Sequence, residues 1–314
     1  MGRKELKRGS RSKKTWGSMH TAAMGAVGSV LIIALSYLFS EYPGQDLFDV
    51  AKNGNEAGVR KLLAAGSNPD LQHPWWNARL QRSVSDEPTA MMAAAQKGAA
   101  GTILALIEFG ADVHLGNNNG QTALYYSVAG SHEEATLALL DAGADFDVQN
   151  DKGSSPLMTA CQHGKVGMVT LLLQRGANPD LGMFSTAVMR KELTSINDGL
   201  GGETALMLAV RAKSEQPASL EVVKLLLAHG ASVNTQDHGG RSALMHAVAA
   251  KHATAMELLL EFGANVNLQT HGGSTALDAL GMHKQFLGPA FSAAFVRRMT
   301  RRLQPTELLA QLGQ

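Results

Sequence analysis

One pattern recurs along the chain with a period near 33 residues, and it limits the fold more than any other feature. The pattern is clearest in residues 120–152, where Thr122 opens an apolar segment and Gly143 follows a run of leucines. Its opening, Ser or Thr before apolar residues, stands at Thr89, Thr122, Ser155, Thr204, Ser242 and Thr275. These starts lie 33, 33, 49, 38 and 33 residues apart. Such a period is typical of proteins that stack one small unit, because each unit buries its apolar face against its neighbours.

Each repeat is predicted to fold as two short helices. The Ser or Thr should cap the first helix by accepting a hydrogen bond from an unpaired backbone N–H. A turn follows, at Lys97-Gly98, Gly130-Ser131 and His163-Gly164. The second helix carries the leucines and should end at a glycine in the left-handed conformation. These glycines are Gly66, Gly110, Gly143, Gly176, Gly230 and Gly263. The Asn-, Asp- and Gly-rich residues after them predict a hairpin-like turn into the next unit.

On these residues the chain resembles the ankyrin repeat family. The family's Thr-Pro-Leu-His signature appears as Thr-Ala-Leu-Tyr (122–125), Ser-Pro-Leu-Met (155–158), Thr-Ala-Leu-Met (204–207), Ser-Ala-Leu-Met (242–245) and Thr-Ala-Leu-Asp (275–278). The resemblance covers residues 45–303 and implies an all-α solenoid of about seven helix pairs joined by hairpin-like fingers. The signature histidine is missing from every unit, so the polar bond that it usually makes between repeats is in question. We expect methionine or tyrosine packing in its place.

An N-terminal segment, residues 15–40, contains no Asp, Glu, Lys or Arg, and its apolar part, 22–39, is long enough to span a bilayer as a helix. Residues 1–14 carry seven Lys or Arg against one Glu, whereas Glu41, Asp46 and Asp49 follow the segment. The positive-inside rule then places the N-terminus in the cytoplasm and the repeats on the other side of the membrane, the periplasm in a bacterium. The alternative is a cleaved signal peptide, although Ala34-Leu35-Ser36 is a poor cleavage site.

Small residues share one face of this predicted transmembrane helix: Ala22, Gly25, Ala26 and Ser29. Such a face permits close packing of two helices in lipid, which predicts a homodimer through the membrane segment. The alternative is the ordinary Ala and Gly content of a membrane helix.

The repeat period breaks where residues are inserted. Gly66 and Gly110 are 44 residues apart, and the excess of 11 lies near 72–87. Gly176 and Gly230 are 54 apart, with 16 extra residues in 181–202 and five in 211–219. The inserts near 72–87 and in 181–202 lie in connections between units, and in the ankyrin family such inserts enlarge the fingers beside the partner-binding face, whereas 211–219 lies between the two helices of one unit. The inserts carry Trp75, Trp76 and Phe184, which are candidate aromatic anchors for a partner. The two tryptophans have two alternatives, contact with the membrane interface or coverage of the first two repeats.

The family resemblance also implies a polar binding surface at the finger tips and at the ends of the first helices. Carried over unit by unit, these positions are Gln96, Lys97, Asn118, Gln121, Gln162, His163, Arg211, His238 and Arg241. A merely solvated surface would have the same composition. At the C-terminal end, residues 290–303 predict a helix whose four arginines seal the array, with a basic patch for an acidic partner as the alternative, and 304–314 form a tail.

The sequence marks no catalytic, metal or cofactor site. It has no phosphate-binding loop, no Gly-x-Ser-x-Gly elbow and no His-Glu-x-x-His motif. Cys161 is the only cysteine and is expected to be a small buried side chain. Residues 15–314 carry a net charge of −5, since the whole chain sums to +1 and residues 1–14 to +6, which argues against nucleic-acid binding. The periodic Asp112, Asp145, Asn178 and Asn265 are expected to form turns.

These observations predict a non-catalytic protein-binding or scaffold module displayed at a membrane, with an unidentified protein as partner and no small-molecule substrate. Two alternatives stay open. In the first, the chain is a structural membrane protein that self-assembles through the small-residue face. In the second, it is an enzyme whose site no motif marks.

Overall fold

The computed structural model describes residues 47–71, 88–183, 201–212 and 217–282. The chain divides into two units, Met1–Asp46 and Leu47–Gln314, and all described residues belong to the second. The described part contains thirteen α-helices and no β-strand, only isolated bridges such as Gly116 to Thr122. The predicted all-α solenoid is therefore confirmed.

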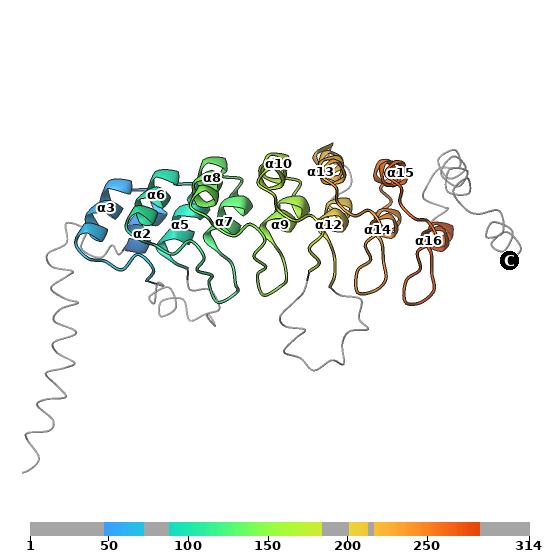
Figure 1. Cartoon of the computed structure of the whole chain (residues 1–314), viewed down its shortest axis with the longest axis horizontal. Coiled ribbons are helices and arrows are strands. Elements are labelled where there is room, and N and C mark those ends of the chain that lie inside the picture. The colour runs from blue at the N-terminus through green and yellow to red at the C-terminus, as the bar shows by residue number, and fades with distance from the viewer. Residues whose placement is uncertain (1–46, 72–87, 184–200, 213–216, 283–314) are drawn as a thin grey trace, which may run out of the picture. The chain divides into compact units, whose positions relative to one another are not determined.

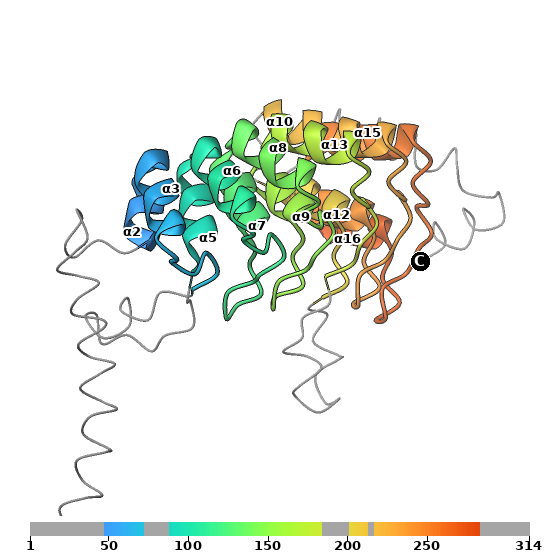
Figure 2. The same cartoon turned by 60° about the vertical axis from the view of Figure 1, so that its left-hand side comes forward.

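The helices form two rows (Figures 1 and 2). The first-helix row consists of α2 (Leu47–Lys52), α5 (Ala90–Lys97), α7 (Ala123–Gly130), α9 (Pro156–Gln162), α12 (Ala205–Arg211), α14 (Ala243–Ala249) and α16 (Ala276–Met282). The second-helix row consists of α3 (Glu56–Ala64), α6 (Ala100–Glu108), α8 (Glu133–Asp141), α10 (Val166–Gln174), α13 (Pro217–Ala228) and α15 (Ala253–Glu261). Each first helix from α2 to α14 packs on the second helix of its own unit, and each first helix also packs on the next one. The repeat in the sequence therefore corresponds to a repeat of the same helix–helix contacts in the structure.

The core between the rows is built from the residues of the signature. The signature leucines Leu124, Leu157, Leu206 and Leu244 are fully buried. The position of the missing histidine is occupied by Met92, Met158, Met207 and Met245, all of them buried. Methionine fills irregular gaps because its side chain is unbranched and flexible. The predicted methionine packing is therefore confirmed, whereas Tyr125, at the same position, is only half-buried.

The predicted helix caps are confirmed in part. The hydroxyls of Thr89, Thr122 and Ser155 accept hydrogen bonds from the backbone N–H three residues on, at 3.3–3.4 Å. Thr204 and Ser242 stand at the same place without such a bond, so the prediction is wrong for these two hydroxyls. All six glycines after the second helices have φ between 84° and 93°, the left-handed region that L side chains avoid.

Several predictions concern residues outside the described part: the membrane segment 15–40, the tail 1–14, the small-residue face, the helix at 290–303 and the tail 304–314. In the ranges that the structure does cover, no helix combines the length and the apolar character needed to cross a membrane.

Candidate functional site

Three of the described fingers are each closed by one side chain near the tip. In the finger before α7, Asn117 Oδ1 accepts from the backbone N–H groups of Asn119 and Gln121, at 3.0 and 2.9 Å. Asn150 and Asp237 close the fingers before α9 and α14 in the same way. The finger before α12 has Met183 at this position, and a methionine cannot form this turn. This is the finger that carries the longer insert.

The base of that finger nevertheless keeps the usual geometry. Met183 N donates to Glu203 O at 3.0 Å, and Gly202 N donates to Met183 O at 2.7 Å. Asn117, Gly120 and Gln121 make the equivalent bonds in a finger of ordinary length. These bonds bring together the two ends of the insert, at Met183 and Gly202. Residues 184–200 themselves lie outside the described part, so the enlargement of this finger stays a prediction.

The periodic Asp and Asn residues form turns, as predicted. Asp112, Asp145, Asn178 and Asn265 each accept a hydrogen bond from the backbone N–H two residues on, at 2.8–3.0 Å. A second periodic position, which was not predicted from the sequence, links one unit to the next. The acceptors are Asp70, Asp147, Asp180 and Asn234, and the donors are the backbone N–H groups of Asp112, Asn178, Ser232 and Asn265, at 2.7–3.0 Å. We call this series the side-chain ladder. Burial raises the pKa of the Asp147 carboxyl.

The side-chain ladder has one break among the described units. His114 occupies the acceptor position of its unit, and no hydrogen bond joins its side chain to the Asp145 N–H. A substitution at this position is therefore a direct test of what one rung contributes.

Two other side chains make polar bonds between units. His132 Nε2 lies 3.0 Å from the backbone oxygen of Gln96, at the end of α5. Lys165 Nζ reaches the backbone oxygens of Val128 and Ala129, at the end of α7. Carbonyl groups in the last turn of a helix have no partner within it, so these bonds satisfy them from the following unit. They supply polar contacts between units, which the absence of the signature histidine had put in question.

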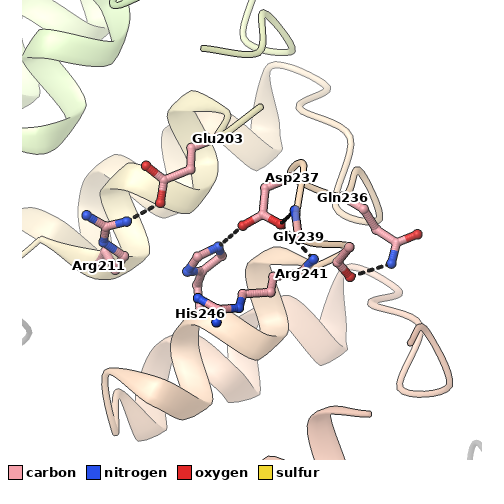
Figure 3. Close-up of polar contacts among 8 residues, drawn as sticks. Glu203, Arg211, Gln236, Asp237, Gly239, Arg241 and His246 are labelled. Atoms are coloured by element: carbon pink, nitrogen blue, oxygen red, sulfur yellow. Dashed lines mark hydrogen bonds and ion pairs between the residues drawn. The ribbon is translucent and has the colours of Figure 1, made fainter. Parts of the chain in front are cut away.

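A cluster of three ionisable side chains lies where the finger with the longer insert meets the next unit (Figure 3). Glu203 precedes α12, Asp237 closes the next finger, and His246 lies on α14. His246 Nε2 is 2.8 Å from Asp237 Oδ2. One ligand atom from each of the three residues lies within 4.8 Å of the others, a geometry in which they could hold a metal ion. No metal site was predicted from the sequence.

Hydrogen bonds at the cluster favour the charged form of Asp237. Burial by itself raises the pKa of Asp237, but hydrogen bonds from His246 and from the backbone N–H groups of Arg241 and Gly239 outweigh it and lower the pKa. Glu203 forms an ion pair with Arg211, whose side chain is 51% exposed. Each carboxylate of the cluster therefore has a side-chain partner in this structure, Arg211 for Glu203 and His246 for Asp237.

Comparison with known proteins agrees with the repeat architecture. The family model described as ankyrin repeats in three copies matches residues 47–150 and 134–237, and the model described as ankyrin repeats in many copies matches residues 219–279. Together they cover most of the chain, from 47 to 279. The chain belongs to the ankyrin repeat family. No curated protein matches it.

Solved structures of other ankyrin repeat domains are similar to this one. The ankyrin repeat domain of Bcl-3, a member of the IkappaB family, is 25% identical with a TM-score of 0.60, covering 77% of this chain and 99% of that one. An ankyrin repeat domain from Acinetobacter baumannii AYE is also 25% identical with a TM-score of 0.57, covering 72% of this chain and 100% of its own. Human ASB11 is 22% identical with a TM-score of 0.60, covering 81% and 97%. Ankyrin repeats are protein–protein interaction modules.

The ankyrin structure separates the predicted binding residues into two lines. Gln96, Lys97, Gln162, His163 and Arg211 are exposed at the C-terminal ends of α5, α9 and α12, which belong to one row. We call these five residues the helix-end line.

The second line lies on the fingers. Arg241 and the half-buried Gln121 directly precede the caps of α14 and α7, and Asn118 is exposed while His238 is half-buried. A helix of seven or eight residues is about 11 Å long, so this line lies roughly one helix length from the first. The two lines therefore do not form one continuous patch on the surface. Trp75, Trp76 and Phe184 lie outside the described residues.

A shallow hollow lies beside the helix-end line. Its volume is about 130 Å³, and it is lined by Phe48, Lys52, Pro88, Met92, Ala93, Gln96 and Tyr126. Small-molecule sites are larger, roughly 300 Å³ or more. A hollow of this size and apolar lining suits one side chain of a protein partner.

Proposed function

We propose that this ankyrin array is a non-catalytic protein-binding module held at a membrane by residues 15–40, with the repeats on the non-cytoplasmic side. One observation carries the binding role. Exposed polar residues of the helix-end line recur at the ends of three first helices in a fold whose members are protein–protein interaction modules. The apolar hollow next to Gln96 supports a protein rather than a small-molecule partner.

The membrane display rests on the sequence alone. Its support is the uncharged segment 15–40 and the excess of basic residues before it. The inserts support the protein-binding role by their composition, because Trp75, Trp76 and Phe184 are aromatic residues of the kind that anchor protein–protein interfaces.

Charge reversal on the two helix rows tests the binding surface. The variant Lys97→Glu with Arg211→Glu alters the helix-end line, and the control, Arg175→Glu with Lys224→Glu, makes the same charge change on α10 and α13. All four side chains are exposed. The first variant removes the ion pair of Arg211 with Glu203, and the control removes those of Arg175 with Asp141 and of Lys224 with Glu221. We expect the first variant to lose partners that the wild type captures in a pulldown analysed by mass spectrometry, with the control unchanged. If the first variant captures partners as well as the control does, the helix-end line is not part of the binding surface.

Two further experiments test the membrane role. A reporter that is active only outside the cytoplasm, fused after Gln314, should be active; an inactive fusion in a stably expressed protein contradicts the orientation. Carbonate extraction should leave the full-length protein in the membrane pellet. Release of a shortened protein would instead show that the N-terminal segment is a cleaved signal peptide.

The inserted aromatic residues need their own variant. Trp75→Ser with Trp76→Ser should weaken partner capture and leave the melting temperature unchanged. A large fall in melting temperature would show that the two tryptophans cover the repeats.

A further inference from the structure

Three side chains from two successive units converge at the base of the finger with the longer insert (Figure 3). Glu203 leaves the finger just before the cap of α12. Asp237 and His246 belong to the next unit, one at the finger tip and one on α14. Their candidate ligand atoms, two carboxylate oxygens and one imidazole nitrogen, lie within 4.8 Å of one another.

The cluster is held in place before any ligand arrives. Asp237 Oδ1 accepts from the backbone N–H groups of Gly239 and Arg241, at 2.9 and 2.8 Å. Its rotation is thereby fixed, and Oδ2 is left directed at His246. The side chains of Asp237 and His246 are only 1% and 5% exposed, while Glu203 is 16% exposed and marks the side open to solvent. A ligand would therefore enter past Glu203 onto two fixed atoms.

The balance of charge at the cluster favours a cation. Two carboxylates lie within 4.8 Å of each other; Glu203 is paired with the half-exposed Arg211, and Asp237 is paired with His246, which carries a charge only when it is protonated. Solvent weakens an exposed ion pair, whereas buried charges need a close partner or a metal ion.

We propose that Glu203, Asp237 and His246 form a binding site for one divalent first-row transition-metal ion, with Zn²⁺ as the best fit. One imidazole nitrogen and two carboxylate oxygens are ligands that Zn²⁺ accepts, and a fourth position would be left for water. The set lacks the six to eight oxygen ligands that Ca²⁺ requires.

The required movements are small. Tetrahedral Zn²⁺ with bonds near 2.0 Å holds its ligand atoms about 3.3 Å apart. The His246 and Asp237 atoms, now 2.8 Å apart, must separate by about 0.5 Å, and Glu203 must approach by at most about 1.5 Å. The hydrogen bond between imidazole and carboxylate is replaced by two bonds to the ion, and the neutral imidazole then carries its proton on Nδ1.

Binding the ion would have two consequences for the array. The base of the finger with the longer insert would be fastened to the next unit by bonds that do not depend on helix packing. Arg211 would also lose its ion pair with Glu203, since the carboxylate turns to the metal, and its side chain would be released to solvent at the helix-end line.

The test measures Zn²⁺ binding to the tag-free full-length chain in detergent by titration calorimetry, with Co²⁺ absorption as a probe of coordination. We expect one ion per chain and tetrahedral Co²⁺ bands. Glu203→Gln should weaken Zn²⁺ binding by about tenfold or more, and His246→Gln should abolish it. Arg211→Ala should strengthen binding by several-fold because it removes the cation that competes for Glu203.

Matched controls distinguish this site from adventitious binding. Glu257→Gln and His229→Gln remove an exposed carboxylate and an exposed imidazole elsewhere in the array and should leave binding unchanged. Absence of a one-to-one Zn²⁺ complex overturns the proposal, as does wild-type affinity in Glu203→Gln. Circular dichroism would show whether His246→Gln unfolds. In that case the test rests on the Zn²⁺ affinities of Glu203→Gln and Arg211→Ala, which should change in opposite directions. A change in the same direction in both variants refutes the site.

Discussion

The break in the side-chain ladder at His114 gives a prediction in which one substitution should stabilise the array. Four units place an Asp or Asn where its side chain accepts the backbone N–H of the next unit. His114 stands at that position without the bond, so His114→Asn should supply the missing rung to the Asp145 N–H. Asparagine is preferred to aspartate here because Asp112 and Asp145 are close by and already charged.

The size of the effect follows from the exposure of the site. An intramolecular hydrogen bond contributes about 0.5–1.5 kcal/mol net, and His114 and Asp145 are both exposed, which favours the lower half of that range. We expect a gain of about 0.5–1 kcal/mol in the free energy of unfolding. Since 1.4 kcal/mol is a factor of ten, the Asp145 amide should exchange about two to five times more slowly.

Amide hydrogen exchange of the full-length chain is the direct assay, supported by urea denaturation followed by circular dichroism. The matched control is Asn234→His, which removes the equivalent rung to Asn265 and should accelerate exchange of that amide by a similar factor. Unchanged exchange at Asp145 in His114→Asn, together with an unchanged urea midpoint, would refute the idea that these side chains join the units.

Three further predictions follow from single residues. Ser131→Gly should raise the free energy of unfolding, measured by thermal unfolding, by about 0.5 kcal/mol, because Ser131 has φ of 61° at a turn where three other units carry Gly54, Gly98 and Gly164; a decrease would contradict this. Asp237→Asn keeps an oxygen for the finger turn but removes the charge. Since the pKa of Asp237 is lowered on folding, the wild type should be more stable than this variant at pH 6. The difference, measured by urea midpoints, should shrink once the pH falls below about 4 and be lost below the lowered pKa of the folded state; a difference that grows in acid would refute the assignment. Burial raises the pKa of the Cys161 thiol, so iodoacetamide at pH 8 should label it only after unfolding, as mass spectrometry would show; rapid labelling of the native chain would contradict its burial.

Local chemistry predicted the repeating unit well. The hydroxyl caps at Thr89, Thr122 and Ser155, the left-handed glycines and the turn-forming Asp and Asn positions all depend on residues next to each other in sequence. Exposure of the helix-end residues also followed from their place in the unit. The inserted aromatic residues and the membrane segment remain predictions, because they lie outside the described part of the chain.

Contacts between units were harder to predict. The side-chain ladder left a periodic signal at Asp70, Asp147 and Asp180, but only the stacking geometry shows that these carboxylates reach the next unit. The cluster of Glu203, Asp237 and His246 left no such signal. The finger insert hides that Glu203 occupies the position of Gln121 in an ordinary finger, and its proximity to His246 depends on how two fingers lie side by side.

The closed base of the finger before α12 makes it a natural place for the chain to diversify. Backbone bonds at Met183, Gly202 and Glu203 bring the two ends of the insertion together, so the solenoid does not depend on what the finger carries. Extending the tip from two residues to 18 costs about 2 kcal/mol of closure entropy, and each further doubling adds only about 0.6 kcal/mol. New recognition sequences can therefore be exchanged at this point while the scaffold stays folded, and an engineered peptide grafted there would inherit a fixed platform at both of its ends.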